Sequence, residues 1–321
     1  MKMWDEAPKT ELFGIQIYTF GLFCMIGTAA AVAAVLILCR HAQRKKGTGA
    51  LLSLMSVLFG LLFSRLFFSV LYSISADGFP FSAWFRISTG GWSLFGMIFG
   101  VFTAAWLCSK ITGENVRGLL DTVSCALPLI IAAERFGERF FEGFDISRPL
   151  QEGGFPENTF LAVKDTFYED ISFLATYLTA AISCIFLFLI LVFFLTRDRR
   201  KDGDLWILFM LLCGAGGVML ESLRYDHYLE LSFVCFQQIL AALMLVWGVI
   251  EAALRNRGRK RMILGACISL PAAIGVCGWI EYALDRTTIS HYLLYAVMAA
   301  VLAVPVTLGI LLLRKREIQA A

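Results

Sequence analysis

Charged residues are scarce in this chain of 321 residues. It has 28 Lys or Arg and 25 Asp or Glu, which is 17% of the sequence against roughly 25% in a soluble domain. Counted with glycine and without tyrosine, apolar residues make up about 64%, where soluble proteins have roughly 45–50%. A soluble core cannot bury that much apolar surface, and a disordered chain would not contain it. We therefore predict that lipid is the solvent for most of the chain.

Motifs of common catalytic and metal sites are missing as well. The sequence has no His-Glu-x-x-His, no nucleophile elbow and no phosphate-binding glycine loop. Its nine cysteines show no paired metal-ligand spacing and lie in or at the ends of apolar runs, where a free thiol behaves as a small hydrophobe. We expect neither a metal nor a cofactor.

Long apolar runs are what the sequence has instead. Each is long enough to cross a bilayer as a helix, and a helix satisfies its own backbone hydrogen bonds in lipid. The alternating pattern of a membrane β-barrel is absent. The expected fold is an all-α polytopic membrane protein with about nine spans, at residues 14–39, 50–73, 91–109, 119–135, 170–196, 204–221, 232–254, 263–284 and 291–313.

Basic residues are concentrated in every second connection between these spans, which places them on one side of the membrane. Of the 28 Lys and Arg, 18 follow spans one, three, five, seven and nine. The positive-inside rule then predicts an N-terminus outside and a C-terminus in the cytoplasm. Each basic run abuts a span, so we do not expect a nucleic-acid partner. The longest external connection, 136–169, is predicted to form a small element whose phenylalanines, such as Phe136 and Phe140, lie at the bilayer surface.

Ionisable residues within or at the ends of spans are candidates for function, because such groups are costly in lipid unless they are paired or hydrated. One interpretation is interhelical salt bridges, which we favour for Asp121 and Glu281. The other is a cluster of guanidiniums that binds a lipid phosphate, because Arg offers bidentate donors to phosphate oxygens. The residues for which the second interpretation is favoured are Arg65, Arg135, Glu221 and Arg224.

The order of several motifs resembles that of the prolipoprotein diacylglyceryl transferases. The resemblance covers about residues 14–254 and leaves the last two predicted spans without a counterpart. Its landmarks are Tyr18 within 15–21, Arg65 within 63–72, Glu134 to Glu138, Gly143 and Arg148 within 140–149, Tyr168-Glu169, Glu221 to Arg224, and Gln238 to Leu240.

The resemblance implies transfer of a diacylglyceryl group from phosphatidylglycerol to the lipobox cysteine of a prolipoprotein, in the bacterial cytoplasmic membrane. It also implies that Tyr18, Glu138 and Glu221 are catalytic. The implied headgroup-binding residues are Arg65, Arg135, Arg148 and Arg224. The chain departs from the family's histidine, asparagine, glutamate and arginine at Phe95, Glu138, Phe144 and Gly217, respectively.

We therefore expect a seven-helix domain at 1–254, including the external segment 136–169, followed by a two-helix hairpin at 255–321. An alternative function is a repurposed relative that binds phospholipid or a lipoprotein precursor without transfer. A transporter is a further alternative. It would be expected to have broken helices, for which the Gly214 to Gly217 run is the only candidate, and close helix packing explains that run more simply.

Overall fold

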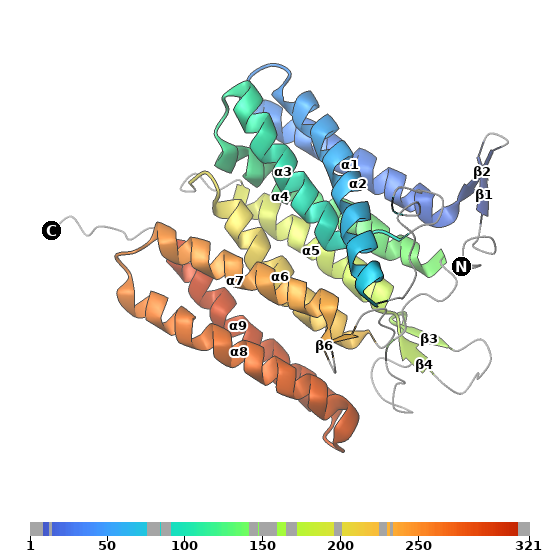
Figure 1. Cartoon of the computed structure of the whole chain (residues 1–321), viewed down its shortest axis with the longest axis vertical. Helices are drawn as coiled ribbons and strands as arrows, with labels where there is room; N and C mark the ends of the chain where they lie inside the picture. The colour runs from blue at the N-terminus through green and yellow to red at the C-terminus, as the bar shows by residue number, and fades with distance from the viewer. Residues whose placement is uncertain are drawn as a thin grey trace. The chain divides into compact units, whose positions relative to one another are not determined.

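The computed structural model describes residues 9–12, 15–75, 84, 91–140, 147, 159–164, 172–195, 201–224, 230–231 and 234–313 (Figure 1). Within these ranges nine helices are long and apolar enough to cross a membrane. This confirms the all-α polytopic fold. The helices are α1 (Thr19–His41), α2 (Thr48–Ser75), α3 (Leu94–Thr112), α4 (Val116–Gly137), α5 (Thr176–Leu195), α6 (Asp204–Leu223), α7 (Phe236–Arg255), α8 (Lys260–Arg286) and α9 (His291–Leu313).

Three short antiparallel hairpins precede helices, and they correct the predicted starts of three spans. Strand β1 (Lys9–Leu12) pairs with β2 (Ile15–Tyr18), β3 (Ala162–Lys164) with β4 (Ser172–Leu174), and β5 (Glu230–Leu231) with β6 (Val234–Cys235). The first, fifth and seventh spans were placed four to six residues too early, since α1, α5 and α7 begin only at Thr19, Thr176 and Phe236. Mean hydropathy does not separate a short apolar strand from the first turn of a helix.

The chain divides into two compact units, and the first contains α1 to α5. Within it α1 packs along α4 and α2 along α3. Two glycines on α3 allow the second contact: a Cβ at Gly100 would lie 2.2 Å from the carbonyl oxygen of Phe59, and one at Gly96 would lie 2.5 Å from that of Phe63. The Gly96-x-x-x-Gly100 spacing brings helix backbones close together in membranes.

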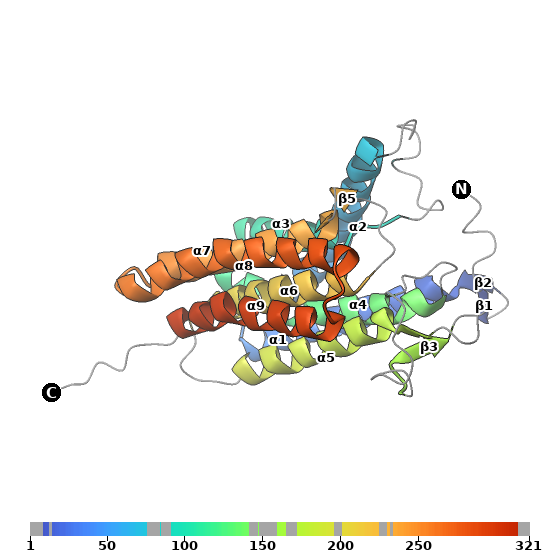
Figure 2. The same cartoon turned by 90° about the horizontal axis from the view of Figure 1, so that it is seen from below.

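The second unit contains α6 to α9, which run alongside one another (Figure 2). Helix α6 is continuous through its glycine run. A Cβ at Gly214 would lie 2.6 Å from the backbone nitrogen of Leu245, and one at Gly217 would lie 2.9 Å from the Cβ of Ala241. The glycine run therefore packs closely against α7, as expected. It does not break α6, so it gives no support to the transporter alternative.

Charged residues also join helix ends outside the spans. Arg44, after α1, lies 3.2 Å from a carboxylate oxygen of Glu114, just before α4, and the backbone N–H of Lys45 donates to the other oxygen at 2.9 Å. The Lys45 hydrogen bond, followed by the one from Arg44, lowers the pKa of Glu114 against the opposing effect of partial burial. Arg44 and Lys45, which the sequence indicates only as topology signals, thus also fix the position of the α3–α4 connection.

Replacing Gly100 by Ala should lower the stability of the protein. The added methyl group meets the backbone of α2, which cannot yield as a side chain does, and overpacking of this kind costs about 1–3 kcal/mol. Thermal unfolding of the purified protein in detergent measures the effect. Gly216→Ala is the matched control, because a Cβ there meets nothing within 4 Å. Equal melting temperatures for the two variants would contradict the close α2–α3 contact.

The effect of Glu114→Gln on stability should depend on pH. A carboxyl whose pKa is lowered by folding contributes stability above its unfolded pKa of about 4.3, and that contribution is lost as the pH falls through the lower folded pKa. The wild-type protein should therefore melt above the variant at neutral pH, and the difference should shrink below about pH 4. Melting curves from pH 3 to 7 test this, and a difference independent of pH would show that the Glu114 charge does not matter.

Candidate functional site

Two arginines converge on one carboxylate where α4 ends. The 3-10 turn η3 (Glu138–Phe140) follows α4 directly. Nη1 of Arg135 lies 2.8 Å from Oε1 of Glu138, and Nη2 of Arg224 lies 3.6 Å from the same oxygen. The three side chains are largely buried, with exposed fractions of 7%, 18% and 13% for Arg135, Glu138 and Arg224. We call this group of three residues the arginine cluster.

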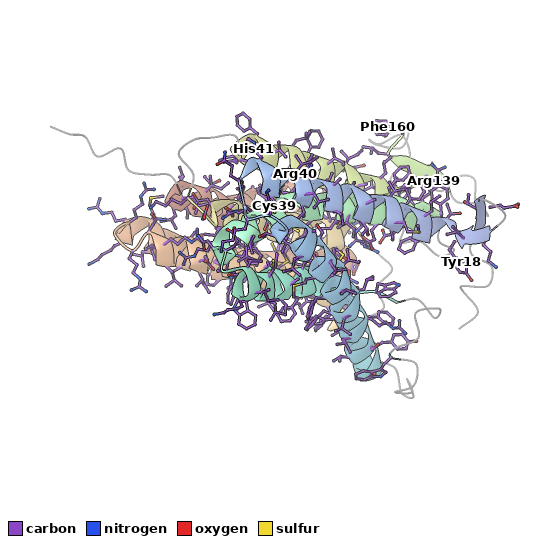
Figure 3. The ribbon with its side chains drawn as sticks, turned by 90° about the horizontal axis from the view of Figure 1, so that it is seen from above. Tyr18, Cys39, Arg40, His41, Arg139 and Phe160 are labelled. Carbon is purple, nitrogen blue, oxygen red and sulfur yellow. The ribbon has the colours of Figure 1, made fainter. Side chains whose placement is uncertain are left out.

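The local sequence explains how α4 contributes two of its members. The sequence places Glu134 over Glu138 and Arg135 over Arg139, two unfavourable like-charge pairs. In the structure Arg135 lies between the two acids, since its Nε is 3.6 Å from Glu134 and its Nη1 contacts Glu138 at i,i+3. Arg139 is exposed (Figure 3). Arg135 therefore pairs with both acids, Arg224 supplies a second positive charge to Glu138, and Arg139 faces outward.

Aromatic side chains hold this end of α4 against α1. The ring of Phe23 lies 5.2 Å from that of Phe136 and 5.3 Å from that of Phe140, measured between centroids. Gly137 leaves room for the contact, because a Cβ there would be 3.0 Å from that of Phe23. The predicted bilayer-surface phenylalanines Phe136 and Phe140 thus pack on α1.

Arg224 is positioned through its backbone as well. It forms an antiparallel bridge with Ser147, which is itself buried. The hydroxyl of Ser147 accepts a hydrogen bond of 2.6 Å from the backbone N–H of Leu174 in β4. Ser147 therefore links Arg224 to the β3–β4 hairpin. Sequence reasoning missed this serine, since nothing around it marks a pairing with a residue so far along the chain.

Arg65 has its own surroundings in α2. Its guanidinium donates to the backbone carbonyls of Trp84 at 2.8 Å and Gly91 at 2.9 Å, and it lies 5.6 Å from the ring centroid of Phe68. Only 5% of the residue is exposed. Arg65 thus binds the connection between α2 and α3, and the described contacts do not join it to the arginine cluster.

Tyr18 ends β2 and is the residue before α1. The ammonium group of Lys9 lies 5.3 Å from the centroid of its ring. Figure 3 shows Tyr18 at the end of the α1–α4 pair where Arg139 also lies, with Cys39, Arg40 and His41 at the opposite end. Tyr18 therefore lies at the same end of the first unit as the arginine cluster.

Glu221 belongs to the second unit, near the end of α6, and is 4% exposed. With its amide nitrogen turned toward the carboxylate, Gln237 donates to both Glu221 oxygens, at 3.1 and 3.3 Å. Arg148 lies outside the described residues, as do Gly143, Phe144, Tyr168 and Glu169.

The arginine cluster is suited to binding an anion. Oε1 of Glu138 marks a position where two guanidiniums stabilise a negatively charged oxygen. The paired N–H donors of a guanidinium group bind phosphate oxygens as well as carboxylate oxygens. Within the described ranges no group of three or more His, Cys, Asp or Glu is placed to hold a metal ion. The cluster itself presents two guanidiniums around one carboxylate in a largely buried position.

Comparison with known proteins gives a consistent match. The family model described as prolipoprotein diacylglyceryl transferase matches residues 9–254. A phosphatidylglycerol–prolipoprotein diacylglyceryl transferase of Clostridioides difficile is 24% identical over 255 residues, which are 78% of this chain and 96% of the relative. A relative with the same description from Clostridium tetani is 25% identical over 74% of this chain and 93% of the relative. A relative described as phosphatidylglycerol–prolipoprotein diacylglyceryl transferase 2, from Clostridium perfringens, is 25% identical over 78% of this chain and 96% of the relative.

Proposed function

This chain belongs to the prolipoprotein diacylglyceryl transferase family, and from that premise we propose that it transfers a diacylglyceryl group from phosphatidylglycerol to the lipobox cysteine of a prolipoprotein. The observation that carries the proposal is the arginine cluster, which lies in the part of the chain that the family model matches. It offers two cations for the phosphate of the lipid.

The reaction requires both a leaving-group site and a base. The thiolate sulfur attacks the glycerol carbon that carries the phosphate ester, so a C–S bond forms and a C–O bond breaks. The electron pair of that bond goes to the phosphate oxygen, and the products are a thioether and glycerol phosphate. The phosphate gains one negative charge as it departs, so cations aimed at it stabilise the transition state.

We assign Arg135 and Arg224 to the phosphate. Glu138 orients both guanidiniums, and the phosphate of the lipid shares them with that carboxylate. Arg65 and Arg148 are proposed as further headgroup contacts and Tyr18 as a catalytic hydroxyl, on the strength of the family resemblance. The position of Tyr18 at the Arg139 end of α1 and α4 supports this assignment.

Two carboxylates are candidates for the base that takes the thiol proton. The described partners of Glu138 are two guanidiniums, which engage its lone pairs. The described partner of Glu221 is a neutral amide, and its side chain is buried. A carboxylate that pairs with two guanidiniums is a weaker proton acceptor, so we propose Glu138 as the residue that orients the arginines and, on the strength of the family resemblance, Glu221 as the base.

The proposed location is the bacterial cytoplasmic membrane, with the N-terminus outside and the C-terminus in the cytoplasm. The alternation of basic residues between the spans supports this orientation. It places the arginine cluster at the outer face, where a prolipoprotein would meet the lipid.

One observation favours binding without transfer as a second candidate function. The family's arginine is replaced by Gly217, where even a Cβ would lie 2.9 Å from that of Ala241. The position is filled by the α6–α7 contact, so an arginine has no room there. A chain that lacks this cation keeps a lipid site with less stabilisation of the departing phosphate.

Expression in cells depleted of their own transferase distinguishes the two functions. Transfer predicts that a reporter prolipoprotein acquires covalently attached lipid. If the reporter stays unmodified while the purified protein still binds phosphatidylglycerol, the binding function is correct and the transferase proposal is wrong.

Arg135→Ala should lower the rate of transfer about 100-fold, the usual scale for removing one donor to developing charge. Arg135→Lys keeps the charge but loses the fork, so an intermediate rate is expected. The measurement is lipid attached per unit of protein confirmed in the membrane. Arg139→Ala is the matched control, because Arg139 is exposed at the same end of the helix. This variant should change the rate less than twofold, since surface substitutions usually change the free energy by no more than about 0.5 kcal/mol. Full activity of Arg135→Ala would remove the phosphate assignment.

Glu221→Gln should lower kcat about 100-fold or more, the contribution typical of a general base, while phosphatidylglycerol binding is retained. Glu138→Gln should weaken lipid binding and lower kcat to a smaller extent, because an amide still accepts from the arginines. Initial rates and lipid binding, measured for both variants, separate the two roles. The reverse pattern would make Glu138 the base.

A further inference from the structure

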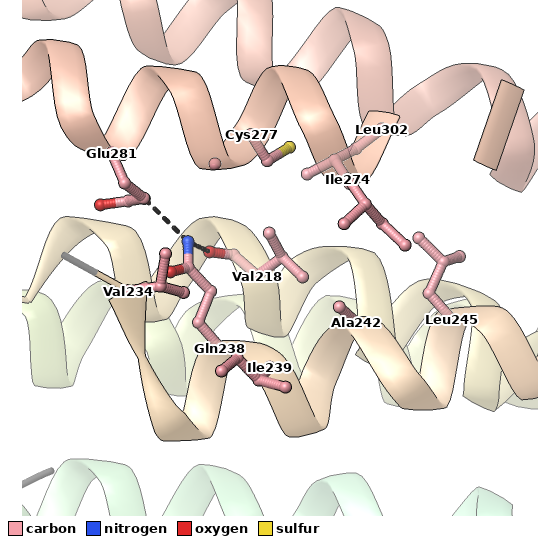
Figure 4. Close-up of a pocket in the computed structure, with 11 residues that line it drawn as sticks. Val218, Val234, Gln238, Ile239, Ala242, Leu245, Ile274, Cys277, Glu281 and Leu302 are labelled. Atoms are coloured by element: carbon pink, nitrogen blue, oxygen red, sulfur yellow. Dashed lines mark hydrogen bonds between the residues drawn. The ribbon is translucent and has the colours of Figure 1, made fainter. Parts of the chain in front are cut away.

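A partly open pocket of about 240 Å³ lies within the second unit, lined by α6, α7, α8 and α9 (Figure 4). Most of its lining is apolar, including Ala242, Leu245, Ile274 and Leu302. Helices α8 and α9 lie beyond the residues that match the family model, which end at 254. The pocket is therefore completed by helices beyond the matched part of the chain, and it shares no lining residue with the arginine cluster.

One end of the pocket is polar. The amide nitrogen of Gln238 donates to a carboxylate oxygen of Glu281 at 2.7 Å and to the carbonyl oxygen of Val218 at 3.2 Å. Both of these partners are acceptors, so the orientation of the amide is fixed and its oxygen faces the other way. That oxygen is buried and has no hydrogen-bond partner, and Gln238 as a whole is 4% exposed.

The unpartnered oxygen defines the polar group of a ligand. The amide oxygen can accept a hydrogen bond from a single donor, such as a hydroxyl group. An ammonium group has three donors and would need three acceptors. No Lys, Arg or His lines the pocket, and a carboxyl group stands at the polar end, so a phosphate would meet no cation there. The chemistry of this end selects a neutral hydroxyl.

The size and lining define the rest of the ligand. Pockets that enclose a drug-sized molecule measure about 300–1,000 Å³, so this smaller pocket holds the upper part of one chain and not a whole two-chain lipid. Its apolar walls continue from Gln238 along α7 to Ala242 and Leu245 (Figure 4). A single acyl chain with a hydroxyl-bearing end matches both features.

We propose that this pocket is a second lipid site, which binds a neutral single-chain acylglycerol. A glycerol hydroxyl of the lipid donates to the amide oxygen of Gln238, and the acyl chain lies between α7 and α8 toward Leu245 and Leu302. Glu281 of α8 holds the amide in the orientation that presents its oxygen. The site goes beyond the proposed transfer, since neither Glu281 nor the α8 wall belongs to the matched part of the chain.

Photolabelling of the full-length protein in phosphatidylcholine nanodiscs tests the site. The probe is a monoacylglycerol with a diazirine in its acyl chain, and labelled peptides are located by mass spectrometry. Labels are expected on α7 and α8 and should be removed by excess unlabelled monoacylglycerol. Labelling is read on the protein itself and needs no turnover, so it is independent of the transfer assay.

Two glycines of α8 supply a matched pair of variants. Gly278 lines the pocket and Gly275 does not, and a Cβ at either meets nothing within 4 Å. Gly278→Leu should fill the pocket and lower labelling about tenfold, the equivalent of roughly 1.4 kcal/mol of affinity, while Gly275→Leu leaves it unchanged. Equal labelling of the two variants would overturn the proposal.

Competition identifies the polar group. The dimethyl ether of monoacylglycerol should require an about tenfold higher concentration than the parent lipid to halve the labelling, because it has no hydroxyl to donate. In Gln238→Leu this difference should vanish. If the ether competes as well as the parent on the wild-type protein, or an alkylammonium of the same chain length competes better, the hydroxyl assignment is wrong. These two comparisons do not depend on the folding of the Gln238 variant.

Discussion

A charged side chain surrounded by apolar helices must find its partner within the protein. Glu138 meets this requirement for Arg135 and Arg224, backbone carbonyls meet it for Arg65, and Gln238 donates to Glu281. In each case the partner lies on another segment or in the next turn, so the pairing fixes which segments are neighbours. The few charges of the chain thereby help to position its connections, while its many apolar residues carry it across the membrane and pack the helices together.

At position 138, where the resemblance to the family implies an asparagine, this chain has a glutamate that pairs with two arginines. A carboxylate carries a full negative charge to two arginines, where an amide oxygen would offer a dipole. The carboxylate therefore holds both guanidiniums around one oxygen atom. Gly217, where the resemblance to the family implies an arginine, is likewise occupied by a packing contact, since a Cβ there would lie 2.9 Å from that of Ala241.

The sequence predicted the nine helices well because spanning a bilayer is a local property: length and hydropathy suffice. It misplaced the starts of α1, α5 and α7, since the strand directly before each of these helices is short and largely apolar. It also located the charges near the ends of α4 and α6 but not the Arg224–Glu138 pair, because the two residues are far apart in the chain and nothing local encodes their contact. The Gly96-x-x-x-Gly100 spacing was readable in the sequence and was overlooked. The roles of Tyr18, Glu138, Glu221 and the arginines stay predictions.

Helix α6 is buried around its whole circumference from Leu205 to Leu211, and Gly309 of α9 lies so close to Leu211 that a Cβ there would be 2.7 Å from it. The order of synthesis therefore matters. The ribosome completes α6 long before α9, so for that interval the side of α6 around Leu211 faces lipid or a temporary neighbour. The second unit therefore reaches its finished packing only when α9 has entered the membrane.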